Sequence, residues 1–192
     1  MFFKFAQVVM RAVLFFSFRI KVYGIENMPK EGGMLVAINH RSLWDVPVVG
    51  AYMPRQLGFM AKSELFKGKM LNKLFTSLGA FPVHRGKGDI GAIKAALKRL
   101  KNGEIVAIFP EGKRVKNNEN VSAKPGAVML ASRANVPVLP IRIIGGYKWM
   151  SKVSIVVGKP VFYDEYYNEK LSLDKLQELS DKLMYDLKEL KP

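Results

Sequence analysis

The chain has no cysteine among its 192 residues and only two histidines. The lack of cysteine excludes disulfides, zinc–thiolate sites and thiol nucleophiles. Because there are only two histidines, any imidazole chemistry has to come from His40 or His84. Acidic side chains are also scarce, with 16 Asp and Glu against 31 Lys and Arg, and the formal net charge is +15. We expect such a chain to bind polyanions in a salt-dependent manner: a nucleic acid, an anionic membrane surface or an acidic protein.

The first 22 residues lack both acidic side chains and a hydrophobic run that could cross a bilayer, although they are rich in phenylalanine. Their longest uninterrupted apolar run covers residues 12–16, whereas a membrane-spanning helix needs roughly 20. Arg11 splits the apolar region and no small-residue cleavage site follows, which argues against a signal peptide. We expect residues 1–22 to form an amphipathic helix in a membrane interface, with its basic groups at the headgroups and its aromatic rings below. The alternative is a helix packed on the protein's own core.

Beyond this segment, apolar runs typical of buried strands alternate with helical patterns. Strands are expected at 34–39, 57–61, 80–83, 105–109, 138–144 and 153–157. Helices are expected at 43–52, at 63–78 with a break at Gly68, from Asp89 to Asn102, at 125–134 and from about Ser172 onward. The alternation predicts one α/β domain over residues 23–192, with a largely parallel mixed sheet covered by helices on both faces.

Three polar clusters follow predicted strands, where parallel sheets place their ligands. They are Asn39–Asp45, Gly79–Lys87 and Phe109–Arg114, and an apolar fourth block, Val136–Pro140, opens a strand. Because the carboxyl ends of parallel strands lie at one edge of a sheet, we expect the polar clusters to form one site.

His40 and Asp45 form the most informative pair in the first cluster. Imidazole is suited to accept a proton near neutral pH, and a carboxylate on its far nitrogen fixes the tautomer and stabilises the imidazolium. Five residues apart on an ideal helix, two side chains point about 140° apart, so the pair needs a strand-to-helix turn. The alternative makes His40 a core histidine and Asp45 a helix cap.

In this order, the four blocks resemble those of the glycerolipid acyltransferases, specifically the bacterial 1-acyl-glycerol-3-phosphate acyltransferases. That family's pattern is His-x4-Asp, then Gly-x5-Arg, then Phe-Pro-Glu-Gly-Thr-Arg, then Val-Pro-x-x-Pro, and all four occur between residues 34 and 144. The third block departs from the pattern, with Lys113 in place of the usual threonine and Val115 where serine often follows.

The resemblance implies an enzyme that transfers a fatty acyl group from an acyl thioester to the sn-2 hydroxyl of lysophosphatidic acid, giving phosphatidic acid. His40 is then the general base, Asp45 orients it, and the hydroxyl attacks directly. The donor is acyl-carrier protein or acyl-CoA, and no metal or redox cofactor is implied. Other acceptors, such as glycerol-3-phosphate or another lysophospholipid, stay open, and an acyl-enzyme on Ser42 is the rival mechanism.

The substrate's phosphate needs cationic and N–H donors, which the second and third blocks contain. We expect Arg85, Arg114 and the Gly112 amide to bind it, with Lys113 as a supplement. Glu111 is expected to bind the glycerol backbone or to order the arginines. Its alternative role is that of a strand-end residue paired with a lysine.

Two regions of the sequence allow more than one interpretation. The Val136–Pro140 block either serves the acyl-donor side or forms an edge strand of the core. Residues 62–75 mix lysines with large apolar side chains, as does a membrane-facing surface, an acyl-chain groove or an ordinary surface helix.

The resemblance to this family and the pattern of the N-terminal segment together predict a monotopic protein on the cytoplasmic face of the inner membrane. The competing class is a non-catalytic module that binds anionic membranes or nucleic acid. No nucleic-acid-binding signature is present, so nucleic acid is not expected as a partner. A passive binder would have no need of the His40–Asp45 pair.

Overall fold

The computed structural model of the protein describes residues 2–83, 89–115, 121–167 and 169–192. The helices are α1 (Phe2–Ser17), α2 (Asp45–Tyr52), α3 (Lys69–Ser77), α4 (Ile90–Lys101), α5 (Gly126–Ala134) and α6 (Leu173–Glu189). The strands are β1 (Arg19–Tyr23), β2 (Met34–Ile38), β3 (Leu57–Lys62), β4 (Phe81–Val83), β5 (Ile105–Ile108), β6 (Val138–Gly145) and β7 (Lys152–Val157). Short 3-10 turns are η1 (Ile25–Asn27), η2 (Ser63–Phe66) and η3 (Asp164–Tyr166).

All of these strands belong to one sheet in the order β1-β7-β6-β2-β5-β3-β4. Neighbouring strands run parallel except for β6 and β7, which are antiparallel. Strand β2 lies at the centre, and each of its residues in the run M-L-V-A-I is buried. Both faces of such a strand need a cover, which the helices supply.

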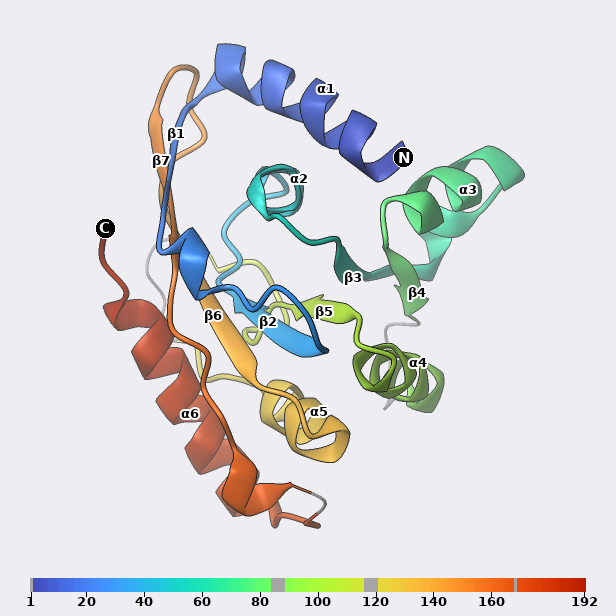
Figure 1. Ribbon diagram of the computed structural model, residues 1–192, viewed down its shortest axis with the longest axis vertical. Coiled ribbons are helices and arrows are strands. Elements are labelled where there is room, and N and C mark those ends of the chain that lie inside the picture. The colour runs from blue at the N-terminus through green and yellow to red at the C-terminus, as the bar shows by residue number, and fades with distance from the viewer. Residues whose placement is uncertain (1, 84–88, 116–120, 168) are drawn as a thin grey trace.

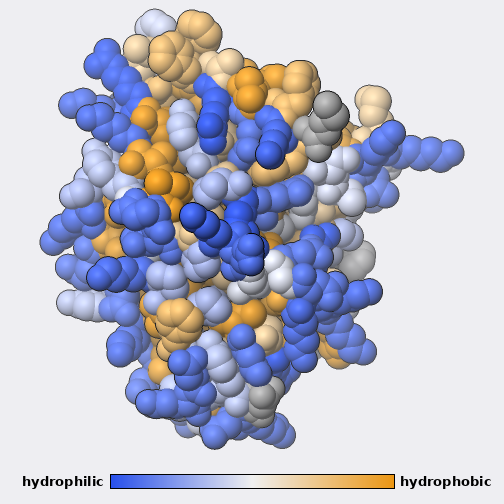
Figure 2. All heavy atoms as spheres, viewed as in Figure 1, coloured by the Kyte–Doolittle hydropathy of each residue, from blue (hydrophilic) through white to orange (hydrophobic). Residues whose placement is uncertain are grey.

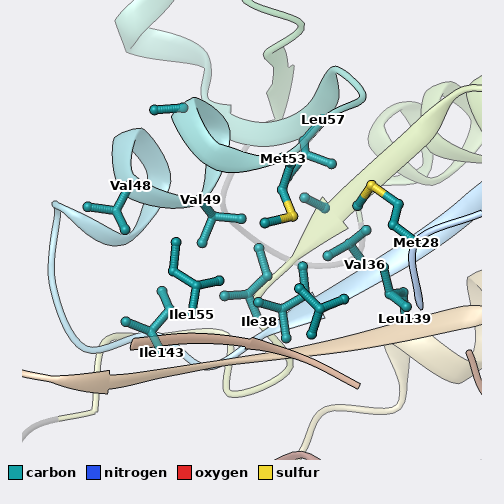
Figure 3. Close-up of a cluster of buried hydrophobic side chains, with 14 of the residues drawn as sticks. Met28, Val36, Ile38, Val48, Val49, Met53, Leu57, Leu139, Ile143 and Ile155 are labelled. Atoms are coloured by element: carbon teal, nitrogen blue, oxygen red, sulfur yellow. The ribbon is translucent and has the colours of Figure 1, made fainter. Parts of the chain in front are cut away.

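Helices α1 and α2 lie on one face of the sheet, and α4, α5 and α6 lie on the other (Figure 1). The alternation of β2 divides its side chains between two cores: Val36 and Ile38 point toward α1 and α2, and Leu35 toward α4, α5 and α6. In the first core, Val48 and Val49 of α2 face the aliphatic side chains of the sheet (Figure 3). The prediction of a single α/β domain with a largely parallel sheet covered on both faces is confirmed.

The helix boundaries follow from local signals in the sequence. The Asp89 side chain accepts from the Ala92 N–H at 3.0 Å, and the Ser172 hydroxyl accepts from the Lys175 N–H at 3.2 Å, so each caps the helix that follows it. Helix α4 ends before Gly103, whose φ of 80° is the left-handed conformation that glycine adopts readily. The break at Gly68 is also confirmed, since η2 and α3 lie on either side of it.

The prediction of one helix over residues 1–22 is wrong at its end. Helix α1 stops at Ser17, and Arg19–Tyr23 form strand β1, which pairs in parallel with β7. The R-I-K-V-Y segment alternates between exposed basic and half-buried β-branched residues at its start, which is a strand pattern. The segment is as basic and apolar as the helix before it, so composition alone does not mark the change of period.

Helix α1 turns part of its polar face toward the protein. The Gln7 amide donates to the carbonyls of Gly50 (3.0 Å) and Met53 (2.8 Å) at the end of α2. Arg11 Nε donates to the Ala51 carbonyl at 2.6 Å. Arg11 thus uses part of its guanidinium on a carbonyl that the end of α2 leaves without a helical partner, and its position at lipid headgroups stays a prediction.

The outward face of α1 is apolar instead. Phe5, Phe15 and Phe16 are 65%, 72% and 72% exposed, and apolar side chains gather over this helix at the top of the molecule (Figure 2). Among the described residues, no helix combines the length and the hydrophobicity needed to span a membrane.

The edge-strand interpretation of the Val136–Pro140 block is also wrong, because β6 lies in the interior of the sheet between β2 and β7. The carbonyl of Pro140 accepts from Gly158 on the β7 side at 2.8 Å, and the N–H that proline lacks would point the same way. The β6–β7 ladder begins at Ile141, so this position costs that ladder no donor.

Candidate active site

The first and third polar clusters lie together at the carboxyl ends of β2 and β5. These two strands are neighbours in the sheet, with Met34 to Ala37 in register with Ile105 to Ile108. The chain leaves β2 into the loop that carries His40 and leaves β5 into the loop that carries Glu111. The expected convergence of these two clusters is therefore what the structure shows.

The His40 and Asp45 side chains are hydrogen-bonded, with 2.9 Å between His40 Nδ1 and Asp45 Oδ2. Asp45 is the first residue of α2 and is fully buried. Its Oδ2 atom also accepts from the backbone N–H groups of Arg41 and Ser42, each at 2.7 Å. Since these donors precede Asp45 in the chain, it organises the strand-to-helix turn and does not cap α2.

This contact fixes the form of the imidazole. An ionised carboxylate only accepts, so Nδ1 of His40 carries the hydrogen, and Nε2 of the neutral ring holds the lone pair. The ring stacks on Phe109 with 3.9 Å between centroids, and the His40 side chain is 16% exposed. The arrangement leaves Nε2 as the atom that can accept a proton.

The loop after β5 holds the backbone of His40 on both sides. Glu111 Oε2 accepts from the His40 N–H at 2.8 Å, and the Val115 N–H donates to the His40 carbonyl at 2.8 Å. Burial raises the pKa of the Glu111 carboxyl to about 7, against the opposing effect of the His40 N–H. The contact observed for Glu111 is with the main chain of His40, and its role toward substrate stays a prediction.

The structure places the predicted phosphate ligands less closely than it places His40 and Asp45. Lys113 and Arg114 are exposed beside this loop. The Gly112 N–H donates to the Phe109 carbonyl at 2.9 Å within a tight turn, so the expectation that it is aimed at a phosphate is not supported. Arg85, together with His84 and Lys87, lies outside the described residues.

Sequence reasoning missed two basic or polar residues near these loops. A β-carbon on Gly112 would lie 2.6 Å from Cε of Lys124, so this lysine extends across the turn and adds a cation beside Lys113 and Arg114. The amide of Asn39 pairs with β6, accepting from the Ile143 N–H at 2.6 Å and donating to its carbonyl at 3.0 Å. Asn39 was visible as a member of the first block, whereas Lys124 had no signal of its own.

The third missed residue is Tyr147, whose hydroxyl donates to Asp45 Oδ1 at 2.8 Å. Burial, together with the charge of Asp45, raises the pKa of the Tyr147 phenol, which stays protonated. Tyr147 lies in the turn between β6 and β7, 102 residues from Asp45, and nothing in the local pattern G-G-Y-K-W-M marks it.

The fold and the site together define an α/β domain with a histidine–aspartate pair at the carboxyl ends of its central strands. A model of the family described as Acyltransferase matches residues 19–144. The chain belongs to the acyltransferase family.

Named relatives and a solved structure agree with this membership. The 1-acyl-sn-glycerol-3-phosphate acyltransferase of Bacillus subtilis (strain 168) is 35% identical over 103 residues, which are 53% of this chain and 52% of that protein. A protein of the same name from Streptococcus pneumoniae (strain ATCC BAA-255 / R6) is 40% identical over 76 residues, 38% of this chain and 28% of that protein. The chain thus spans about half, or less, of the curated relatives it matches.

The solved structure is the crystal structure of the 1-acyl-sn-glycerophosphate (LPA) acyltransferase, PlsC, from Thermotoga maritima. It is similar with a TM-score of 0.75 and 27% sequence identity, over 99% of this chain and 81% of that chain.

The raised pKa of Glu111 predicts a pH-dependent stability difference. Between 4.5, the usual value, and about 7, the folded protein binds the Glu111 proton more tightly than the unfolded chain, so this group destabilises the fold increasingly as pH rises through that window. Glu111→Gln keeps an oxygen for the His40 N–H without the buried charge. We expect its Tm relative to the parent to be higher at pH 8 than at pH 5. Glu165→Gln, an exposed glutamate in η3, gives the baseline, and an equal Tm difference at both pH values would contradict the raised pKa.

Proposed function

We propose that this protein transfers a fatty acyl group from an acyl thioester to the sn-2 hydroxyl of 1-acyl-glycerol-3-phosphate, forming phosphatidic acid. The observation that carries the proposal is the buried, hydrogen-bonded Asp45–His40 pair in a chain of the acyltransferase family. The names of the relatives and of the Thermotoga maritima structure supply the acceptor.

In this mechanism His40 Nε2 takes the proton of the acceptor hydroxyl while the oxygen attacks the thioester carbonyl. The tetrahedral adduct then collapses, the carbon–sulfur bond breaks, and the leaving thiolate takes the proton from the imidazolium. Asp45 stabilises the imidazolium that exists between the two transfers. We propose direct attack in preference to an acyl-enzyme on Ser42, because the resemblance to the glycerolipid acyltransferases implies attack by the acceptor hydroxyl itself.

The reaction is tested with purified protein in lipid vesicles, supplied with lysophosphatidic acid and either acyl-carrier-protein thioester or acyl-CoA. Phosphatidic acid is measured by mass spectrometry. His40→Ala is expected to lower the rate about 10²- to 10⁴-fold, the usual contribution of a general base. Asp45→Asn should follow it, and Asp174→Asn, an exposed aspartate on α6, is the matched control. A folded His40→Ala variant with the parental rate would refute the mechanism, and an acylated Ser42 trapped during turnover would refute direct attack.

Arg114 and Lys113, with Lys124 beside them and Arg85 from the second block, are proposed to bind the acceptor's phosphate. All are cations, and the three that the structure describes are exposed near the loop that holds His40. An arginine can bind two phosphate oxygens at once, which holds the headgroup without involving the hydroxyl.

Arg114→Ala is expected to raise the KM for lysophosphatidic acid about tenfold, in line with the loss of a charge-assisted hydrogen bond. The KM for the donor should stay constant, as should the rate with a monoacylglycerol, which has no phosphate. Arg133→Ala, at the exposed end of α5, is the control. A parental KM for lysophosphatidic acid in Arg114→Ala would remove this residue from the phosphate site.

The proposed location is an anionic membrane surface, at the cytoplasmic face of the inner membrane. The outward face of α1 carries the exposed phenylalanines, and Trp149 beside it is 81% exposed, with its Nε1 donating to the Phe16 carbonyl at 3.2 Å. Basic residues surround this apolar area, among them Arg19, Lys148 and Lys152. Aromatic side chains flanked by cations are suited to an anionic interface.

The presence of only two tryptophans allows a direct measurement of membrane contact. In Trp44→Phe, Trp149 is the only tryptophan, and its fluorescence, excited selectively beyond the tyrosine band, should be quenched strongly at low salt by vesicles that contain anionic and brominated lipids. In Trp149→Phe, the remaining Trp44 is 38% exposed and should be quenched less. Unquenched Trp149 on vesicles that bind the protein would exclude this side of α1 as the contact surface.

A further inference from the structure

We propose that Tyr147 is a positioning residue for the acyl transfer, which it serves by fixing the Asp45 carboxylate that orients His40. This role rests on the proposed function. Tyr147 belongs to none of the four sequence blocks, and it reaches the site from the turn between β6 and β7.

The first argument is how the Asp45 carboxylate is held. Its Oδ2 atom serves His40 Nδ1 and the N–H groups of Arg41 and Ser42, at 2.9, 2.7 and 2.7 Å. Its Oδ1 atom accepts from the Tyr147 hydroxyl at 2.8 Å. Rotation about the terminal bond moves both oxygens, so every donor on either oxygen restrains the plane of the carboxylate. Tyr147 supplies the donor on Oδ1 and thereby helps to hold the orientation in which Asp45 meets the imidazole.

The second argument is that the tyrosine ring is placed by contacts other than Asp45. The buried Phe18 packs edge-to-face on the Tyr147 ring, with 5.3 Å between centroids. The turn is also fixed at both ends. Arg41 Nη1 donates to the Gly145 carbonyl at 3.2 Å, and the Met150 N–H donates to the Ser17 carbonyl at 2.7 Å. Met150 has a φ of 58°, so the chain adopts a left-handed residue without glycine to make this connection.

The third argument concerns the charges around the pair. Arg41 and Glu111 face it from the loops after β2 and β5, and Tyr147 faces it from the β6–β7 turn. The Tyr147 phenol keeps its proton beside the carboxylate, so it is always a donor. Its hydrogen bond therefore offsets part of the negative charge of Asp45 through a group that does not titrate with the pair.

Tyr147→Phe is the discriminating variant, because it keeps the ring that packs on Phe18 and removes only the hydroxyl. We expect kcat to fall about tenfold, the factor that one hydrogen bond represents, with KM unchanged for both substrates. The acidic limb of the kcat–pH profile should move to higher pH, since a carboxylate with one donor fewer favours the charged imidazole. Tyr185→Phe, an exposed tyrosine on α6, should match the parent in all three measurements.

A second readout needs no activity. The Nδ1 proton of His40 is expected to give a proton NMR signal downfield of the amides, assigned by its loss in His40→Gln. In Tyr147→Phe this proton should exchange with water about tenfold faster, because the carboxylate that holds it is restrained by one hydrogen bond fewer. If the parent protein transfers no acyl group, the proposed reaction fails while this measurement still decides the role of Tyr147. Parental exchange and a parental pH profile in Tyr147→Phe would overturn the proposal, even if the variant is less stable.

Discussion

The buried carboxylate of Asp45 is the constraint on which the rest of the site depends. An isolated buried charge costs several kcal/mol, so it persists only where hydrogen bonds replace its lost water. Here the donors come from the turn after β2, from the imidazole and from the turn between β6 and β7. Strand order brings these segments together, because β2 and β6 are neighbours in the sheet. The fold therefore places the His40–Asp45 pair and also supplies the hydrogen bonds that stabilise the buried carboxylate.

The same accounting of polar groups explains the orientation of α1. The end of α2 leaves carbonyls without helical partners, and Gln7 and Arg11 supply their donors. With these polar side chains pointing inward, Phe5, Phe15 and Phe16 lie on the outer surface. An exposed apolar surface of this kind, on a protein with a formal net charge of +15, is unusual for a protein surrounded only by water. Helix α1 is thus satisfied by the protein on its inner side and leaves an apolar outer side exposed.

Much of this could be predicted from sequence. Apolar runs such as Met34–Ile38 gave the strands, and the four blocks gave the dyad, because both signals are local. The end of α1 is not predicted correctly, because the strand that follows it is short and has the same basic and apolar composition as the helix. The expected phosphate contact of the Gly112 amide stays a prediction, because a glycine suggests an open backbone whereas the turn itself uses that donor. Tyr147 and Lys124 were beyond reach, because only the packed tertiary structure brings them to the site.

The turn between β6 and β7 has two sides with different surroundings. Tyr147 points inward to Asp45, and Trp149, two residues later, points outward beside the end of α1. The two rings share one six-residue turn, so the segment that donates a hydrogen bond to the Asp45 carboxylate also carries an exposed tryptophan. The proposed membrane contact and the proposed catalytic pair are therefore separated by two residues of main chain and not by the depth of the domain.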